Sequence, residues 1–75
     1  MRFTAEKDTR YRAVIHLGFF ESVASNDTLK EKFEEVGLIS VTVWGSGHDR
    51  SAEGVWPGET QEVELPSQIV SVTKL

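Results

Sequence analysis

Ser46, His48 and Asp49 are the side chains that most suggest chemistry, because a hydroxyl, an imidazole and a carboxylate are the parts of a nucleophile, base and acid triad. They fall within four positions, in a glycine-rich segment typical of a polar turn. A working triad needs side chains that converge from separate elements of a rigid scaffold, whereas neighbours in one turn diverge. The sequence therefore predicts no catalysis at this turn, and a protein that is not an enzyme.

Metal and cofactor ligands are also sparse. His16 and His48 are the only histidines, and they have neither His-x-His nor His-x-x-x-His spacing. Glu62 and Glu64 share one strand face without a third ligand. The glycines of residues 45–47 follow one predicted strand and precede another, so they lead to no helix N-terminus that could hold a phosphate. We expect neither a metal nor a cofactor.

A tryptophan-bearing hairpin is the stronger candidate for recognition. Its proposed binding residues are Trp44, His48, Asp49, Arg50 and Trp56. Trp and Arg are enriched at the energetic centres of protein interfaces, and these five residues would cluster around one hairpin. Both tryptophans could also belong to the core. We expect one of them to be exposed.

These residues need a scaffold, and the residues before them predict one. Residues 11–18 alternate apolar and polar side chains with the period of a strand that is covered on one side. From Asp27 onward the pattern becomes helical, with Leu29, Phe33 and Val36 at i, i+4 and i+7. The segment therefore predicts a strand followed by a helix.

Both ends of the helix carry sequence signals. Ser25 or Asn26 can accept a hydrogen bond from the free amides of the first turn. Gly37 supplies the left-handed residue that commonly ends a helix. Residues 38–44 are β-branched and alternating, which predicts a second strand directly after the cap, with Ile39 on the same face as Val41 and Val43.

The rest of the chain reads as strands and turns. Further strands are predicted over residues 51–56, 60–65 and 69–75, separated by turns at 45–50 and 57–59 and by Pro66. The result is an α+β fold of order β-α-β-β-β(-β), with one helix packed on one face of a small, mainly antiparallel sheet. Residues 1–10 form an N-terminal arm or an edge strand, and residues 11–75 form a single small domain.

One helix cannot cover both faces of such a sheet, so one face is expected to stay open. If His16, Thr42 and Trp44 point to that face, it offers either a mixed polar and aromatic surface for a partner or a solvated face with one tryptophan. Phe19, Phe20 and Val23, between the first strand and the helix, are predicted to cap the core. The outer face of the helix is mostly charged.

Composition narrows the classes of partner. The net charge of −4 and the scattered Lys and Arg residues argue against nucleic acid. The chain has no cysteine and no segment with the length and apolar character of a membrane span or a signal peptide, which predicts a cytoplasmic protein with no membrane partner. Packing, or association with another chain, must then stabilise the fold.

The run from Val14 to Phe20, followed by Leu29, Phe33 and Gly37, resembles the opening of SPOR domains. The resemblance covers about the first 45 residues and implies a βαβ start and binding of denuded peptidoglycan glycans. Beyond Gly45 the family pattern calls for a second helix, whereas this chain continues with strands, so no glycan-binding residue is carried over. The short, acidic, cysteine-free chain also resembles small phage or prophage accessory proteins, for which a virion location would follow.

The leading hypothesis from the sequence is a non-enzymatic interaction or assembly module that binds a protein partner or a second copy of itself. It would use the open sheet face or the hairpin between Gly45 and Gly58. A glycan-binding module of the SPOR type is the alternative.

Overall fold

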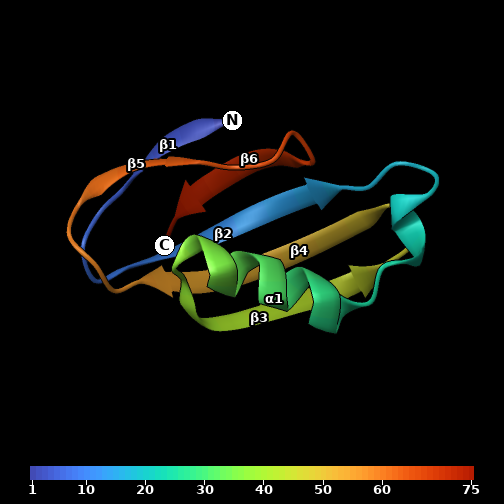
Figure 1. Cartoon of the computed structure of the whole chain (residues 1–75), viewed down its shortest axis with the longest axis horizontal. Helices are drawn as coiled ribbons and strands as arrows, with labels where there is room; N and C mark the ends of the chain where they lie inside the picture. The colour runs from blue at the N-terminus through green and yellow to red at the C-terminus, as the bar shows by residue number, and fades with distance from the viewer.

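The computed structural model describes residues 1–75, the whole chain, as an α+β domain of six strands and one α-helix (Figure 1). In chain order the elements are β1 (Arg2–Ala5), β2 (Thr9–His16), a 3-10 helix (Glu21–Val23), α1 (Asn26–Val36), β3 (Ile39–Ser46), β4 (Asp49–Trp56), β5 (Gln61–Glu64) and β6 (Ile69–Lys74). All strand pairs are antiparallel. The predicted fold class is confirmed, and the predicted N-terminal arm contains the strand β1.

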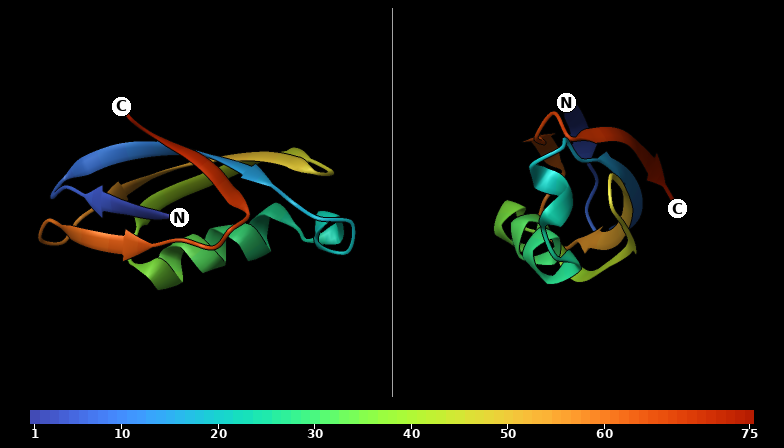
Figure 2. Two further views of the ribbon diagram at one scale, coloured as in Figure 1. Left: turned by 90° about the horizontal axis from the view of Figure 1, so that it is seen from above. Right: turned by 90° about the vertical axis from the view of Figure 1, so that its right-hand side faces the viewer.

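The strands form two sheets rather than the single sheet predicted. Four of them pair in the order β3-β4-β2-β6, and β1 pairs with β5 alone. The small sheet continues the β2–β4 pair, which ends at Thr9 opposite Trp56. Beyond these residues the backbone turns on both sides, and the segments pair again as β1 and β5, from Ala5 opposite Gln61. The β1–β5 ribbon is therefore folded back over the sheet, on the same side as α1 (Figure 2, left).

Because β2 and β3 are both antiparallel to β4, they run parallel to each other with β4 between them. The helix α1 makes the connection between these two strands and packs against β3 (Figure 1). Alternation along β2 buries Ala13 and Ile15, while Arg12 and Val14 face outward. The core lies between the sheet on one side and α1 with the β1–β5 ribbon on the other; it comprises Ala5, Tyr11, Ala13, Ile15, Leu17, Phe33, Val41, Ala52, Trp56, Val63, Leu65 and Ile69.

The ends of α1 match their sequence signals. The Oγ of Ser25 accepts a hydrogen bond from the Thr28 amide at 3.1 Å, so Ser25 is the N-cap. Gly37 ends the helix with φ of 121° and lies against the ring of Trp56. No helix of the chain is long and apolar enough to cross a membrane.

The predicted face of Ile39 is wrong. Ser40 has φ of 53°, and the register between β3 and β4 shifts between Ile39 and Thr42. One extra residue in a strand reverses the alternation beyond it. Val41 therefore stays buried, whereas Ile39 lies exposed opposite Val55.

Candidate functional site

The face of the four-stranded sheet that is turned away from α1 and the ribbon carries no covering element. Its two central rows of outward side chains follow from the strand register. We call them the open sheet face; the rows are Trp44, Ser51, Val14, Ser71 and Thr42, Glu53, Arg12, Thr73. Trp44 and Val14 are each 41% exposed. The face therefore carries one tryptophan among polar side chains, which agrees with both alternatives that the sequence left open.

An ion pair occupies the middle of this face. The guanidinium of Arg12 donates to one oxygen of Glu53 from Nη2 at 2.7 Å and from Nε at 3.0 Å. Arg10 lies 3.8 Å from the other oxygen of Glu53. These charges are thus paired with one another, and Trp44 and Val14 are the apolar groups of the two central rows.

The predicted hairpin residues do not form one cluster. His48 and Asp49 lie at the β3–β4 turn, next to His16. His16 was not among the predicted binding residues. Asp49 lies 3.3 Å from Nδ1 of His16, and the two histidine rings stack with centroids 6.1 Å apart. Nδ1 of His48 lies 2.9 Å from the carbonyl oxygen of Leu17. The pairing of β2 with β4 places His16 here, because His16 lies directly opposite Asp49.

Arg50 is not an exposed binding residue. It is 6% exposed, and its guanidinium donates to the carbonyls of Gly47, Ala24 and Ser22 and to the Asn26 side chain at 2.8–3.1 Å. Residues at even positions of β4 face the core, which places this charge beneath the segment that precedes α1. Its donors stabilise that segment and leave little for a partner.

Trp56 is likewise part of the core, at 5% exposure. Its indole Nε1 donates to the Glu59 carbonyl at 2.8 Å. It pairs with Thr9 at the opposite end of β4 from Trp44, whose partner is Ser51. One tryptophan is therefore exposed, as expected, but the two do not share a surface.

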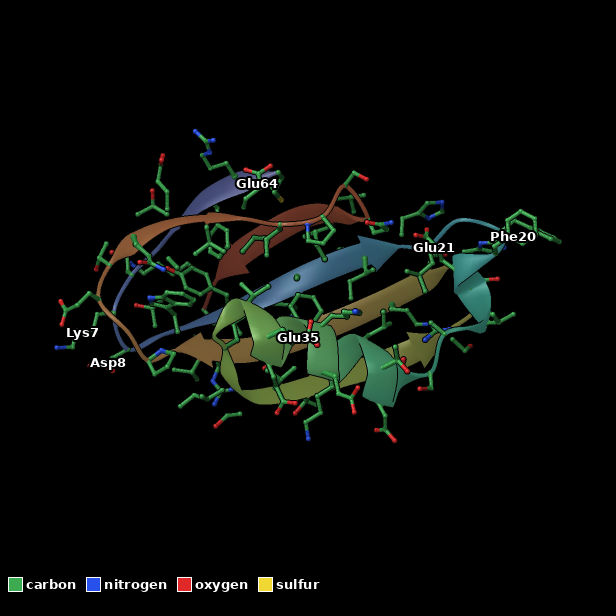
Figure 3. All side chains as sticks on the ribbon, in the orientation of Figure 1. Lys7, Asp8, Phe20, Glu21, Glu35 and Glu64 are labelled. Atoms are coloured by element: carbon green, nitrogen blue, oxygen red, sulfur yellow. The ribbon has the colours of Figure 1, made fainter.

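An unpredicted apolar surface lies where β2 connects to α1. Phe19, Phe20 and Val23 are 78%, 86% and 88% exposed, so the prediction that they cap the core is wrong. We call these three residues the apolar tip. Figure 3 shows Phe20 projecting from the end of the molecule at which α1 begins. The rings of Phe19 and Phe20 contact each other edge to face, with centroids 5.3 Å apart.

Local hydrogen bonds hold this tip in shape. A carboxylate oxygen of Glu21 accepts from the Gly18 amide at 2.9 Å, and the other accepts from the Gln68 side chain. The Oγ of Ser22 donates to the Phe19 carbonyl at 2.8 Å. These side-chain bonds support a 3-10 turn whose backbone bonds run from the amides of Glu21, Ser22 and Ala24, and the apolar side chains lie on its exposed surface. No sequence pattern distinguished these residues from core residues, because large apolar side chains are most often buried.

A second apolar feature begins beside the tip. A groove of about 250 Å³ runs between α1 and the segment that joins β5 to β6. We call it the helix groove; its lining includes Ile15, Leu17, Leu29, Phe33, Leu65 and Ile69. Glu21 and Ala24 line it where it meets the tip, and Lys32 is the other charged residue along it.

Among the titratable groups, Lys74 is the one with a clearly shifted pKa. No group of three potential metal ligands is present among residues 1–75. The pKa of Lys74 is raised above 10.5 because its ammonium donates to Glu6 at 2.9 Å and is attracted by that charge. This pair lies at the end of β2 remote from the tip, since Lys74 is opposite Tyr11.

Comparisons with known proteins add no family. No family model, no curated protein and no solved structure matches the chain.

Proposed function

We propose that this protein is a non-enzymatic interaction domain that binds a protein through the apolar tip. The observation that carries the proposal is the exposure of Phe19, Phe20 and Val23, which is 78% or more for each. Single exposed apolar residues are ordinary, but three large ones within five positions of a structured turn are typical of an interaction site. Aromatic side chains also carry much of the energy of protein interfaces.

The construction of the tip suits binding. The hydrogen bonds of Glu21 and Ser22 order the turn in the free chain. A partner would then need to immobilise little more than the side chains, which lowers the entropy cost of association.

The charges near the tip favour a protein over an anionic surface. Between His16 and Asp27 the chain has no Lys or Arg, and Glu21 is acidic. Nucleic acids and anionic membranes attract clustered basic residues. A protein pocket that accepts aromatic rings fits this surface better than either.

Photo-cross-linking in the source cells tests the proposal. A benzophenone amino acid in place of Phe20 is expected to give a discrete protein adduct. The same probe at Glu31, exposed on the outer face of α1, is the matched control and is expected to give none. The absence of an adduct at position 20, or equal labelling at both positions, would contradict the proposal.

Glycan binding is a second candidate, supported by the open sheet face. Trp44 stands there beside the hydroxyl residues Ser51 and Thr42, an arrangement in which an indole can stack on a sugar while hydroxyls bond to it. Retention on denuded peptidoglycan that Trp44→Ala abolishes would support this candidate. No retention of the wild-type chain would exclude it.

A further inference from the structure

We infer that the partner of the apolar tip is a second copy of this chain, whose helix groove receives the tip. The inference rests on the proposed function and names its partner. The chain carries both halves of such a contact, an exposed aromatic pair and an unfilled apolar groove.

The size of the groove fits aromatic side chains. An apolar cavity of about 150 Å³ is enough to bind benzene. The helix groove has about 250 Å³, so it can accept one phenyl ring and part of a second group. Pockets for drug-sized ligands start at about 300 Å³. Side chains such as Phe19 and Phe20 are therefore better matched to this groove than a cofactor is.

A copy cannot fill its own groove. Glu21 and Ala24 are both part of the groove lining, and Phe20 and Val23 are their neighbours in the chain. To enter the groove, the tip would have to reverse direction within a residue or two, against the hydrogen bonds that hold the 3-10 turn. The rings of Phe19 and Phe20 accordingly stay exposed although the groove begins beside them.

The same proximity allows two copies to exchange tips. Because the tip adjoins one end of the groove, two antiparallel copies related by a two-fold axis can each insert a tip into the other. Such an isologous contact is closed and forms a dimer rather than an open chain of molecules.

Charge complementarity supports this arrangement. Glu21 is the only charged residue of the turn that bears the tip, and Lys32 is the only cation that lines the groove. Lys32 has only a long contact of 3.9 Å with Glu35, on the exposed side of α1. Its ammonium is therefore free to meet Glu21 of the other copy.

Sedimentation equilibrium of the full chain measures the contact. We expect a reversible dimer whose dissociation constant rises at least about tenfold with Phe19→Ser and Phe20→Ser together, as the loss of a buried aromatic side chain implies. Lys32→Glu is expected to weaken the dimer, whereas Lys30→Glu makes the same charge change outside the groove and should not. Circular dichroism checks that each variant is folded. A monomer at all concentrations, or a dimer insensitive to the Phe substitutions, would overturn the inference.

Disulfide trapping then maps the contact, since the chain has no native cysteine. Val23→Cys keeps both phenylalanines, and Leu29→Cys lies on the groove wall. When the two variants are mixed under mild oxidation, we expect a mixed disulfide to form at least about tenfold faster than between Val23→Cys and Lys30→Cys. Equal rates would place the dimer contact elsewhere and overturn the inference.

The outcomes separate this inference from the proposed function. A monomeric chain that still cross-links from position 20 to a different protein overturns the inference and leaves the proposed function standing. A monomeric chain with no adduct removes both. Binding to phosphatidylcholine vesicles that Phe20→Ser abolishes, by a chain that is monomeric in solution, would assign the tip to a lipid surface and also overturn the inference.

Discussion

The buried guanidinium of Arg50 donates to three backbone carbonyls and to the Asn26 side chain. The sequence favoured an exposed binding role for Arg50, because the residue ends the predicted turn that follows Trp44. Its position in the β4 alternation decides otherwise, because even-numbered residues of β4 face inward. The guanidinium then connects the β3–β4 turn at Gly47 with the start of α1 at Ala24 and Asn26.

Replacing Arg50 by Met is expected to lower the free energy of unfolding by about 2–4 kcal/mol, because several buried carbonyls lose a charged donor. Urea denaturation followed by circular dichroism measures the change. Arg12→Met is the control, since Arg12 is exposed and its pair with Glu53 should contribute less than about 1 kcal/mol. Similar losses for both variants would show that Arg50 has no special structural role.

Lys74 makes the stability of the fold depend on pH. Its pKa is raised by the hydrogen bond from its ammonium to Glu6, and next by the charge of that carboxylate. A pKa higher in the folded chain than in the unfolded chain means that the pair stabilises the fold below pH 10.5. This contribution is lost as the pH rises through the folded value.

An NMR titration of the Lys74 side chain should therefore have a midpoint above 10.5. Glu6→Gln is expected to lower that midpoint towards 10.5, whereas Glu62→Gln, which pairs with Arg2 instead, should leave it in place. A midpoint unaffected by Glu6→Gln would assign the shift to another cause.

At the scale of elements, the sequence was sufficient for most of the fold. The helix was predicted from its spacing and caps, and every strand after residue 10 was placed to within about two residues of its observed bounds. Local patterns are enough for this because caps and alternation depend on neighbouring residues. They do not determine which strands pair, and so the separate β1–β5 ribbon and the bulge at Ser40 were missed.

Burial was less predictable than secondary structure for the same reason. Trp44 and Trp56 both lie on predicted strands, and only the register shows that one faces outward and the other inward. Phe19, Phe20 and Val23 are large and apolar, which favours a core position until the turn that exposes them is known. The best candidate site was therefore invisible to composition and spacing.

The C-terminal end of α1 lies against the sheet residue Trp56 through Gly37. Gly37 has φ of 121°, and a Cβ there would lie 3.0 Å from Cζ3 of Trp56. We expect Gly37→Ala to lower the free energy of unfolding by about 1–3 kcal/mol, through backbone strain and this close contact.

Gly58 is a matched control because a Cβ there would meet the same indole, but at an ordinary 3.7 Å and without a positive φ. Gly58→Ala is expected to change stability by no more than about 0.5 kcal/mol. If denaturant melting ranks the two variants equally, neither the backbone conformation nor the contact at Gly37 is important.

At the scale of the whole molecule, the two faces of the four-stranded sheet differ in how far other elements cover them. The inner face is covered twice, by α1 and by the β1–β5 ribbon (Figure 2). The outer face and the apolar tip are left uncovered. In a fold of 75 residues whose core has 12 buried apolar residues, the three large apolar side chains of the tip stay outside that core.

We expect the β1–β5 ribbon to open separately from the rest of the molecule, because the two strands form a sheet of their own. It is joined to the sheet by three connections, to β2, β4 and β6, and its inward contacts come mainly from Phe3, Ala5 and Val63. Phe3 packs edge to face on Tyr11 with centroids 5.3 Å apart. Removing that ring should loosen β1 and β5 together, since each strand is the only pairing partner of the other.

We therefore expect Phe3→Ala to increase amide exchange in residues 2–5 and 61–64 by a common factor, while β2, β4 and α1 keep most of their protection. Hydrogen exchange measured by mass spectrometry or NMR resolves these segments. The physical reason is that opening the ribbon breaks no hydrogen bond within the four-stranded sheet or within α1. Phe33 of α1 also stays packed in the core. Val14→Ala, on the outer face, is the control and should leave the ribbon closed. An equal loss of protection in every element would mean that the ribbon and the sheet unfold as one cooperative unit.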